Sequence, residues 1–192
     1  MRAPEPTTLV GEHVRLVPLG MEHVDDLVTA AAYDEIWAWT GSGQMTTAAG
    51  VRAHVEDSLA DPARLPFAVL VEGRAIGSTS YGDIDLSVGG IEIGWTWYTP
   101  VAWSTAVNPE CKLLLLGHAF DDLGAGRVFL KTDGNNARSQ AAIRRLGARY
   151  DGTLRHHRLR ADGSVRDSAY FSILATEWPQ VQASLLGRLG RA

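Results

Sequence analysis

The feature that most constrains the fold is a strand, a loop and a helix that follow one another around residues 89–112. Residues 91–98 are rich in β-branched and aromatic side chains, a composition typical of a buried strand, and Glu92 is the single carboxylate among them. Pro100 ends this strand. A strand that feeds a loop at the N-terminus of a helix brings unpaired N–H groups and the positive end of the helix dipole together. The stretch therefore predicts an anion site, and the anion it favours is a phosphate.

The helix after the loop is predicted from residue 108 to about residue 123. Asn108 is a favoured N-cap, and Pro109 is a favoured first helical residue because its missing N–H has no partner there. Glycines at 124 and 126 supply the stop. The predicted inward stripe, at helical spacing, consists of Leu113, Leu116, Ala119, Phe120 and Leu123.

Periodicity and turn signals divide the rest of the chain into short elements. The chain has 192 residues, 45% of them hydrophobic, which suits one compact domain over residues 1–192 with a loose end at residues 1–6. Other strands are predicted at residues 8–19, 66–71, 75–83, 127–132, 149–160 and 166–174, and other helices at 21–32, 47–59, 137–146 and 177–189.

Charge and cysteine content bound the partners and the compartment. The net charge is −4, which gives no general field that attracts nucleic acid or an anionic membrane. The lone Cys111 cannot form an internal disulfide, and no long apolar run or signal-like start is present, so we expect a cytoplasmic protein without a membrane partner. Cys111 itself is interpreted as a small packing residue.

Several short motifs occur in an order that resembles the GNAT superfamily of acetyl-CoA-dependent N-acetyltransferases. The branch most similar in these marks contains the ribosomal-protein N-terminal acetyltransferases, which act on alanine or serine termini. The motifs are Glu92-Ile93-Gly94-Trp95, Glu110 with the helix end Leu116-Gly-His-Ala-Phe120, Asn136-Ala-Arg-Ser139, Ile143-Arg-Arg-Leu-Gly147, Asp151-Gly-Thr-Leu-Arg155 and Tyr170-Phe-Ser-Ile173.

One segment departs from that family. Its pyrophosphate loop usually reads Gln/Arg-x-x-Gly-x-Gly/Ala, whereas residues 103–108 read Trp-Ser-Thr-Ala-Val-Asn. Ala106 and Asn108 replace the two small positions, where glycine lets the backbone approach a phosphate. We therefore expect Ala106 to constrain φ in this loop, with an effect on cofactor affinity.

The resemblance implies an α/β (α+β) fold: a mostly antiparallel, V-splayed sheet of about seven strands flanked by helices. It implies acetyl-CoA bound in the splay, no metal, and an acetyl transfer to a primary amine. A protein N-terminus is the favoured acceptor, and a homodimer is possible. Two alternatives stay open: a small-molecule amine acceptor, such as an amino acid, polyamine or aminoglycoside, and a non-catalytic module that binds CoA for sensing or assembly.

The resemblance also assigns roles to residues of this chain. Glu92 matches the catalytic base, and Ser139 the general acid that protonates the departing thiolate. The cofactor-binding positions are Trp95, Thr96 and Trp97 through their main chain, then Trp103, Ser104, Thr105, Ala106, Val107 and Asn108 around the pyrophosphate, with Asn136 and Ser139 at the pantetheine arm. The acceptor-binding positions are Trp37, Trp39, Tyr81 and Tyr170.

General chemistry supports a buried glutamate as base, since an apolar setting raises the pKa of a carboxyl toward the useful range. A structural alternative exists at each position. Glu92 could lie at an exposed edge or in an ion pair with an arginine, Asn136 could be a simple helix cap before a solvated serine, and Trp37 and Trp39 could pack between helices. The basic cluster at residues 155–166 is interpreted as a solvated strand surface, with phosphate or acidic-acceptor contact as the alternative.

Overall fold

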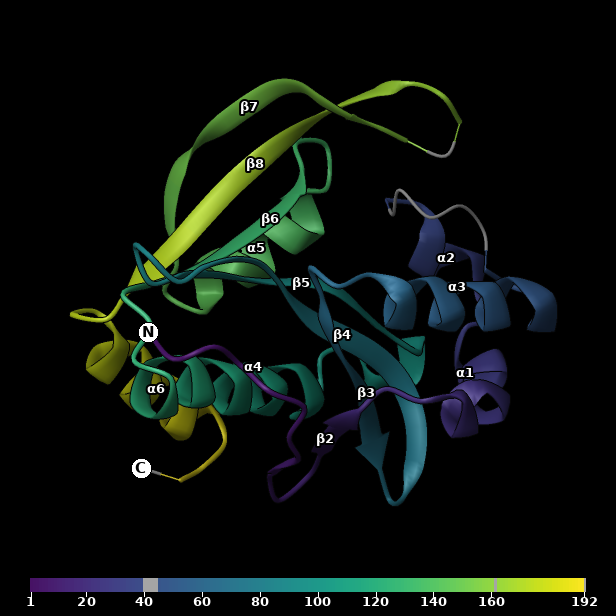
Figure 1. The fold of residues 1–192 in the computed structure, drawn as a ribbon, viewed down its shortest axis with the longest axis horizontal. Helices are drawn as coiled ribbons and strands as arrows, with labels where there is room; N and C mark the ends of the chain where they lie inside the picture. Colours follow the sequence, from purple (N-terminus) through teal and green to yellow (C-terminus); the bar gives the residue numbers. More distant parts are fainter. Residues whose placement is uncertain (40–44, 161, 192) are drawn as a thin grey trace.

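The computed structural model describes residues 1–39, 45–160 and 162–191, and its central feature is a mixed sheet (Figure 1). Eight strands form this sheet in the order β1-β2-β3-β4-β5-β6-β8-β7. Neighbouring strands are antiparallel except for the parallel pair β5 and β6. The strands are β1 (Leu9–Val10), β2 (Arg15–Pro18), β3 (Leu65–Val71), β4 (Arg74–Asp85), β5 (Gly90–Tyr98), β6 (Arg127–Asp133), β7 (Arg149–Leu159) and β8 (Val165–Leu174).

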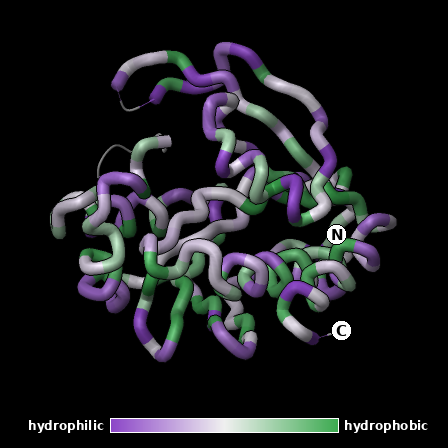
Figure 2. Tube along the Cα trace, turned by 180° about the vertical axis from the view of Figure 1, so that it is seen from behind, coloured by the Kyte–Doolittle hydropathy of each residue, from purple (hydrophilic) through white to green (hydrophobic). Residues whose placement is uncertain are grey.

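Helices cover both faces of the sheet. One hydrophobic cluster joins the sheet to α4, α5 and α6, and a second cluster joins the opposite face to α1, α2 and α3. Hydrophilic residues recur along the hairpin of β7 and β8 (Figure 2), and no helix in the described ranges is long and apolar enough to cross a membrane. The helices are α1 (Val24–Ala30), α2 (Asp34–Trp37), α3 (Ala48–Ala60), α4 (Val107–Gly117), α5 (Ala137–Arg145) and α6 (Trp178–Arg188).

The sheet splays between its two central strands. Strands β5 and β6 pair only over three positions, ending where Glu92 lies opposite Phe129. Beyond that point β5 continues beside β4, whereas β6 continues beside β8 (Figure 1). The predicted V-shaped opening is therefore present, and Glu92 stands at its apex.

The first predicted strand is two short strands instead of one. Strands β1 and β2 pair with each other across a turn at residues 11–14. The buried carboxylate of Glu110 holds this turn, because it accepts hydrogen bonds from the main-chain N–H groups of Glu12, His13 and Val14 at 2.6–2.9 Å. The prediction of a loose end at residues 1–6 also fails at Arg2, because the main-chain N–H of Arg2 donates a hydrogen bond to Leu123 O at 2.8 Å.

Helix α4 begins two residues earlier than predicted. Ala106 is the N-cap, and Asn108 lies within the first turn, where its Oδ1 accepts a hydrogen bond from the Tyr98 hydroxyl at 3.3 Å. A π-helical turn, His118–Asp122, continues the helix. The buried stripe includes Cys111, as predicted for a packing residue, and Leu115, whereas Leu113 is only partly buried.

Candidate active site

The site is built around Glu92, whose side chain is buried at the apex of the splay. Glu92 as a whole is 2% exposed to solvent. It lies opposite Gly82 of β4 and Phe129 of β6. Gly94 provides the space for the carboxylate, because a Cβ at that position would come within 2.6 Å of Glu92 Oε1. In the sequence Glu92-Ile93-Gly94, the glycine therefore leaves space for the Glu92 carboxylate inside the sheet.

Lys131 and Asp83 surround this carboxylate. Lys131 Nζ lies 2.8 Å from Glu92 Oε2 and donates a hydrogen bond to Asp83 Oδ2 at 2.5 Å. The contact with Glu92 Oε2 is close but does not have the direction of a hydrogen bond, so charge holds this pair together. The alternative of an ion pair is thus present, with lysine as the partner instead of arginine.

The pKa of Glu92 reflects two opposed influences. Burial raises the pKa, and the ammonium group of Lys131 lowers it, with a net result of about 6. The nearby carboxylate of Asp83 adds to the increase. At neutral pH Glu92 is about nine-tenths ionised, so it can accept a proton.

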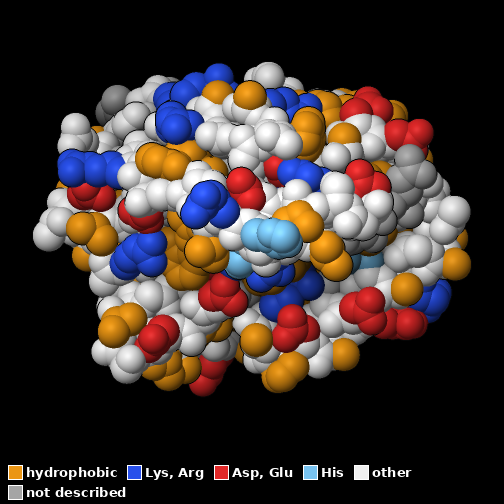
Figure 3. Space-filling model, turned by 90° about the horizontal axis from the view of Figure 1, so that it is seen from above, with side chains coloured by type: hydrophobic (Ala, Val, Ile, Leu, Met, Phe, Trp, Pro, Cys, Tyr) orange, Lys and Arg blue, Asp and Glu red, His pale blue; other side chains and the backbone are white. Residues whose placement is uncertain are grey.

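Aromatic and histidine side chains from the β7–β8 hairpin complete this side of the site. Tyr170 lies opposite Lys131 in the β6–β8 pairing, with its ring centre 5.8 Å from Lys131 Nζ. The register of β7 shifts between Leu154 and Arg158, and His157 in this irregular stretch contacts Ser168 Oγ through Nδ1 at 2.9 Å. Histidine, basic and acidic side chains gather in the middle of this face of the molecule (Figure 3).

The other side of Glu92 carries an arginine and a tryptophan. Arg64 donates a hydrogen bond to Ser80 Oγ at 3.0 Å, and its guanidinium carbon lies 4.4 Å from the centre of the Trp95 ring. Trp95 has a φ of +51°, and it falls where the β4–β5 register shifts by one residue. This β-bulge turns its ring over Gly82, where a Cβ would come within 2.4 Å of it.

The loop before α4 offers main-chain donors suited to a phosphate. Within the described chain, the N–H groups of Ser104, Ala106 and Asn108 have no acceptor, whereas that of Val107 donates to Thr105 Oγ1. They lie at the positive end of an eleven-residue helix. Ala106, which was expected to constrain φ here, has an ordinary right-handed helical φ of −65°. The positive φ falls on Ser104 instead, at +63°.

The first turn of α5 borders the same loop. Asn136 caps the helix, with Oδ1 accepting from the Ser139 N–H at 2.9 Å, so the capping alternative is present for this pair. The guanidinium carbon of Arg138 lies 3.9 Å from the centre of the Trp103 ring. Trp103 Nε1 in turn donates to Tyr98 O at 3.1 Å, so the loop connects the end of β5 to the start of α5.

Comparison with known proteins agrees with this arrangement. Residues 13–149, more than half of the chain, match the family described as "Acetyltransferase (GNAT) domain". The chain belongs to the GNAT family. It is therefore an acetyltransferase by family, although no curated protein matches it.

Solved structures share the GNAT fold over nearly the whole chain. A GCN5-related N-acetyltransferase from Brucella melitensis is 29% identical, with a TM-score of 0.91 and coverage of 96% of this chain and 86% of that one. A protein from T. thermophilus, assigned provisionally as an acetyltransferase, is 36% identical, with a TM-score of 0.90 and coverage of 97% and 99%. Mycobacterium smegmatis RimJ in complex with CoA-disulfide is 22% identical, with a TM-score of 0.82 and coverage of 100% and 98%.

Two of the positions assigned by GNAT resemblance have side chains that point away from the splay. Tyr81 is fully buried and donates its hydroxyl to Leu115 O at 2.5 Å beneath α4. It offers no surface to an acceptor, and we leave it out of the site. Thr96 also faces α4, where its Oγ1 contacts Thr79 Oγ1 at 2.8 Å and accepts from Lys112 Nζ at 3.0 Å. Only its main chain can serve the cofactor.

The tryptophans have different positions. Trp37 is buried, donates Nε1–H to Ala31 O at 2.9 Å, and lies with its ring centre 5.1 Å from that of Trp97. Trp37 and Trp97 both belong to the hydrophobic cluster under α1 and α3. Trp37 is therefore a packing residue, the alternative given for it in the sequence analysis. Trp39 is 41% exposed, and Tyr170 is half-buried beside Lys131. These last two can still reach an acceptor.

The basic cluster of the last hairpin does not act as one unit. Arg160 pairs with the buried carboxylate of Asp133 at 2.6 Å, whereas Arg166 donates to Ser168 Oγ at 3.0 Å. Over residues 1–39, 45–160 and 162–191, no group of three or more His, Cys, Asp or Glu side chains is placed to hold a metal.

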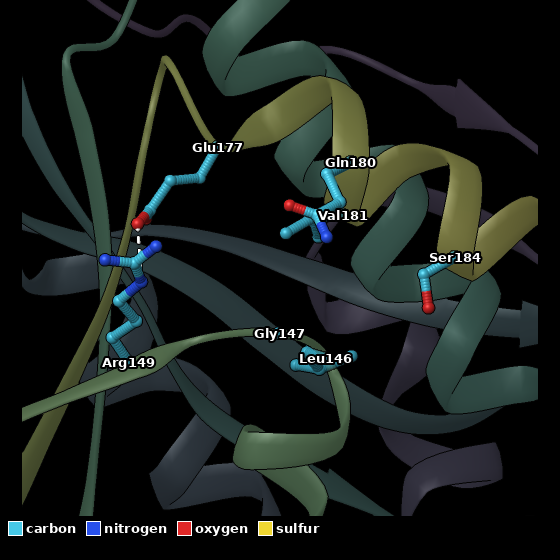
Figure 4. Close-up of a pocket in the computed structure, with 7 residues that line it drawn as sticks. All are labelled: Leu146, Gly147, Arg149, Glu177, Gln180, Val181 and Ser184. Atoms are coloured by element: carbon cyan, nitrogen blue, oxygen red, sulfur yellow. Dashed lines mark ion pairs between the residues drawn. The ribbon is translucent and has the colours of Figure 1, made fainter.

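A separate pocket of about 290 Å³ lies between the end of α5 and α6. Arg149 and Glu177 form an ion pair of 2.7 Å at its rim, and Gln180 and Ser184 line it (Figure 4). Among its described lining residues there is neither a fully buried carboxylate nor a cluster of N–H groups without acceptors. We therefore assign the chemistry to the splay.

Sequence reasoning missed Lys131, Asp83 and Arg64. A lone lysine in the apolar run of residues 127–132 was a usable signal, because a charge inside a central strand requires a partner. The identity of that partner depends on the register between β5 and β6, which local sequence does not encode.

Proposed function

We propose that this chain transfers the acetyl group of acetyl-CoA to a primary amine, with Glu92 as general base. The observation that carries the proposal is the ionisable carboxylate of Glu92, 2% exposed at the point where β5 and β6 separate, with its pKa raised to about 6. A base at this pKa is largely ionised at neutral pH and still basic enough to take a proton from an amine that is forming a bond.

The reaction requires a neutral amine next to an activated carbonyl. Bound acetyl-CoA supplies an acetyl thioester. The chain's contribution is to hold the amine near Glu92, accept the proton that leaves nitrogen as the carbon–nitrogen bond forms, and provide a proton for the departing thiolate. The candidates for that last proton are Ser139, in the first turn of α5, and the half-buried Tyr170 beside Lys131.

The proposed cofactor-binding site consists of main-chain groups. Among the described residues, the β5 edge from Trp95 to Tyr98 has no strand neighbour on the β6 side, so an extended pantetheine arm can pair with it. The free N–H groups of Ser104, Ala106 and Asn108 suit the pyrophosphate. The φ of Ala106 is ordinary, which supports a loop that can still bind the pyrophosphate. The alternative of a non-catalytic CoA-binding module, based on Ala106 and Asn108, predicts CoA binding without acetyl transfer.

We favour a protein N-terminus as the acceptor. The motifs resemble the ribosomal-protein N-terminal acetyltransferases, and the fold is shared with RimJ of Mycobacterium smegmatis. An α-amino group with a pKa near 8 is about a tenth neutral at pH 7, so it requires less of the base than a lysine does. A cytoplasmic location, consistent with the single free Cys111, is part of the proposal.

The test separates binding from chemistry. We expect Glu92→Gln to reduce kcat by roughly 10²–10⁴-fold while the Kd for CoA, measured by calorimetry, stays unchanged. Glu177→Gln is the matched control, since Glu177 is also ion-paired but lies outside the splay. Unchanged turnover in Glu92→Gln across the pH range would exclude this carboxylate from the mechanism.

The acceptor is identified in a second assay. Peptides with free N-termini, the same peptides with blocked N-termini and an internal lysine, and small amines are compared by thiol release. Acetylation of the free N-terminal peptides alone supports the proposal. Acetylation of amino acids, polyamines or aminoglycosides without peptide turnover identifies a small-molecule enzyme instead.

A further inference from the structure

Three charged side chains from three adjacent strands meet at the apex of the splay. Asp83 lies on β4, Glu92 on β5 and Lys131 on β6. Lys131 Nζ is 2.5 Å from Asp83 Oδ2 and 2.8 Å from Glu92 Oε2, so one ammonium group bridges two carboxylates. The Glu92 side chain is 2% exposed and that of Asp83 is 50% exposed. The cluster therefore extends from the interior of the sheet to solvent.

We propose that Asp83 and Lys131 are positioning residues for Glu92: they set its protonation, and Asp83 is the route by which a proton leaves Glu92 for solvent. The inference rests on the proposed function, since it assigns a further role at the same site. Asp83 and Lys131 are not assigned to contact the acceptor or the acetyl group.

The proton balance is simple. As the carbon–nitrogen bond forms, the nitrogen–hydrogen bond breaks and its proton passes to the Glu92 carboxylate. Lys131 Nζ contacts an oxygen of each carboxylate, so Glu92 and Asp83 are neighbours across one ammonium group. The neutral Glu92 can therefore pass its proton to ionised Asp83, directly or through one water molecule, and Asp83 can release the proton to solvent. Lys131 keeps its own proton throughout and returns Glu92 to the ionised form, because the charged ammonium favours a carboxylate beside it.

The two carboxyls hold a proton with different affinity, and this difference fixes their roles. Hydrogen bonding and charge from Lys131 hold the pKa of Asp83 below its usual value, whereas burial raises the pKa of Glu92 to about 6. A shared proton therefore rests on Glu92, and its transfer to Asp83 is uphill. The step is productive because Asp83 is half exposed and releases the proton to water. The left-handed backbone of Asp83, with a φ of +40°, lies in a register shift between Gly82 and Asp85. Such a bulge re-aims a side chain, here toward Lys131.

Other titratable or charged groups face this cluster from every element around it. They are Arg64 before β3, His157 and Arg158 on β7, and Arg166 and Tyr170 on β8. Arg64 and Arg166 act on Glu92 from greater range and stay charged through neutral pH, so they contribute a constant background. Asp83 and Lys131 are therefore the groups whose removal changes the pKa of Glu92 directly.

The experiment measures the pKa of Glu92 itself. Carboxyl signals of ¹³C-labelled glutamate are followed through a pH titration without cofactor, and Glu92 is assigned from its loss in Glu92→Gln. We expect Asp83→Asn to lower this pKa and Lys131→Met to raise it, each by roughly one unit. The acid limb of the kcat/KM profile should move by the same amount in the same direction, and the plateau of Asp83→Asn should fall.

The control is Asp151→Asn, because Asp151 also accepts from a cation, Arg127, at 2.6 Å on the same sheet but away from Glu92. Lys131→Gln replaces Lys131→Met if circular dichroism shows that the methionine variant is unfolded. An unmoved Glu92 pKa in both charge-removing variants overturns the inference, even if acetyl transfer is observed. Shifted pKa values in an enzyme that acetylates no amine support the tuning and reject the proposed function.

Discussion

Lys112 provides a sharp test of how burial controls this protein's stability. It lies on α4 with only 4% of its surface exposed. Its Nζ donates to Thr96 Oγ1 at 3.0 Å, and no carboxylate in the described ranges forms an ion pair with it. Burial lowers the pKa of Lys112 from 10.5 to about 8. The ammonium group is therefore held in the core at a free-energy penalty, and Lys112→Met removes it.

The sign and size of this penalty follow from linkage. Because the folded pKa lies below the unfolded one, the penalty is complete below about pH 8 and disappears as the pH rises to 10.5. A difference of about 2.5 units corresponds to about 3 kcal/mol at 1.36 kcal/mol per unit. The variant also loses one hydrogen bond, worth about 1 kcal/mol, while Thr96 keeps its contact with Thr79. The net expectation is a gain of about 2 kcal/mol at pH 7.

Urea unfolding at pH 7 and pH 10.5 measures both parts of this expectation. Lys112→Met should be more stable than the parent at pH 7, and this advantage should vanish or reverse by pH 10.5. Arg52→Met, at an exposed position of α3, is the control and should change neither value by more than about 0.5 kcal/mol. A Lys112→Met variant that is less stable at pH 7, or whose advantage is independent of pH, would refute the reasoning.

Two further substitutions test local structure. Glu110→Gln should reduce the free energy of unfolding by about 3 kcal/mol in urea at pH 7, because a buried carboxylate that accepts three main-chain N–H groups and pairs with Arg191 loses its charge. Burial raises the pKa of Glu110, but these hydrogen-bond donors outweigh burial and lower it overall. The contribution of Glu110 to stability is therefore complete above about pH 4.5 and is lost at more acid pH. A Glu110→Gln variant with parental stability at pH 7 contradicts this expectation. Asn136→Ala should lower stability by about 1 kcal/mol in thermal unfolding through loss of the α5 cap, and an unchanged Tm would show that the cap contributes nothing.

Elements defined by local chemistry were predictable from sequence. The strand that contains Glu92 and the cap at Asn136 are both present, because a β-branched run or a capping side chain acts within a few residues. The GNAT fold itself followed from the order of such local motifs along the chain.

Features that depend on distant partners were not predictable. The division of the first strand depends on Glu110, which lies 96–98 residues from the three N–H groups that it accepts. The start of α4 was misplaced because Asn108 has a capping side chain, yet its Oδ1 is occupied by the Tyr98 hydroxyl. Lys131 was missed because only the parallel pairing of β5 with β6 brings it to Glu92.

The backbone around the site shares one further property. Three non-glycine residues with positive φ, Asp83, Trp95 and His156, each lie where a strand pairing shifts its register. Such conformations cost about 1–3 kcal/mol each and persist only where the surrounding structure enforces them. Each shift turns a side chain in or beside it, Asp83, Trp95 or His157, toward the surroundings of Glu92. The sheet is therefore irregular where its central carboxylate needs neighbours, and a regular ladder would direct these side chains elsewhere.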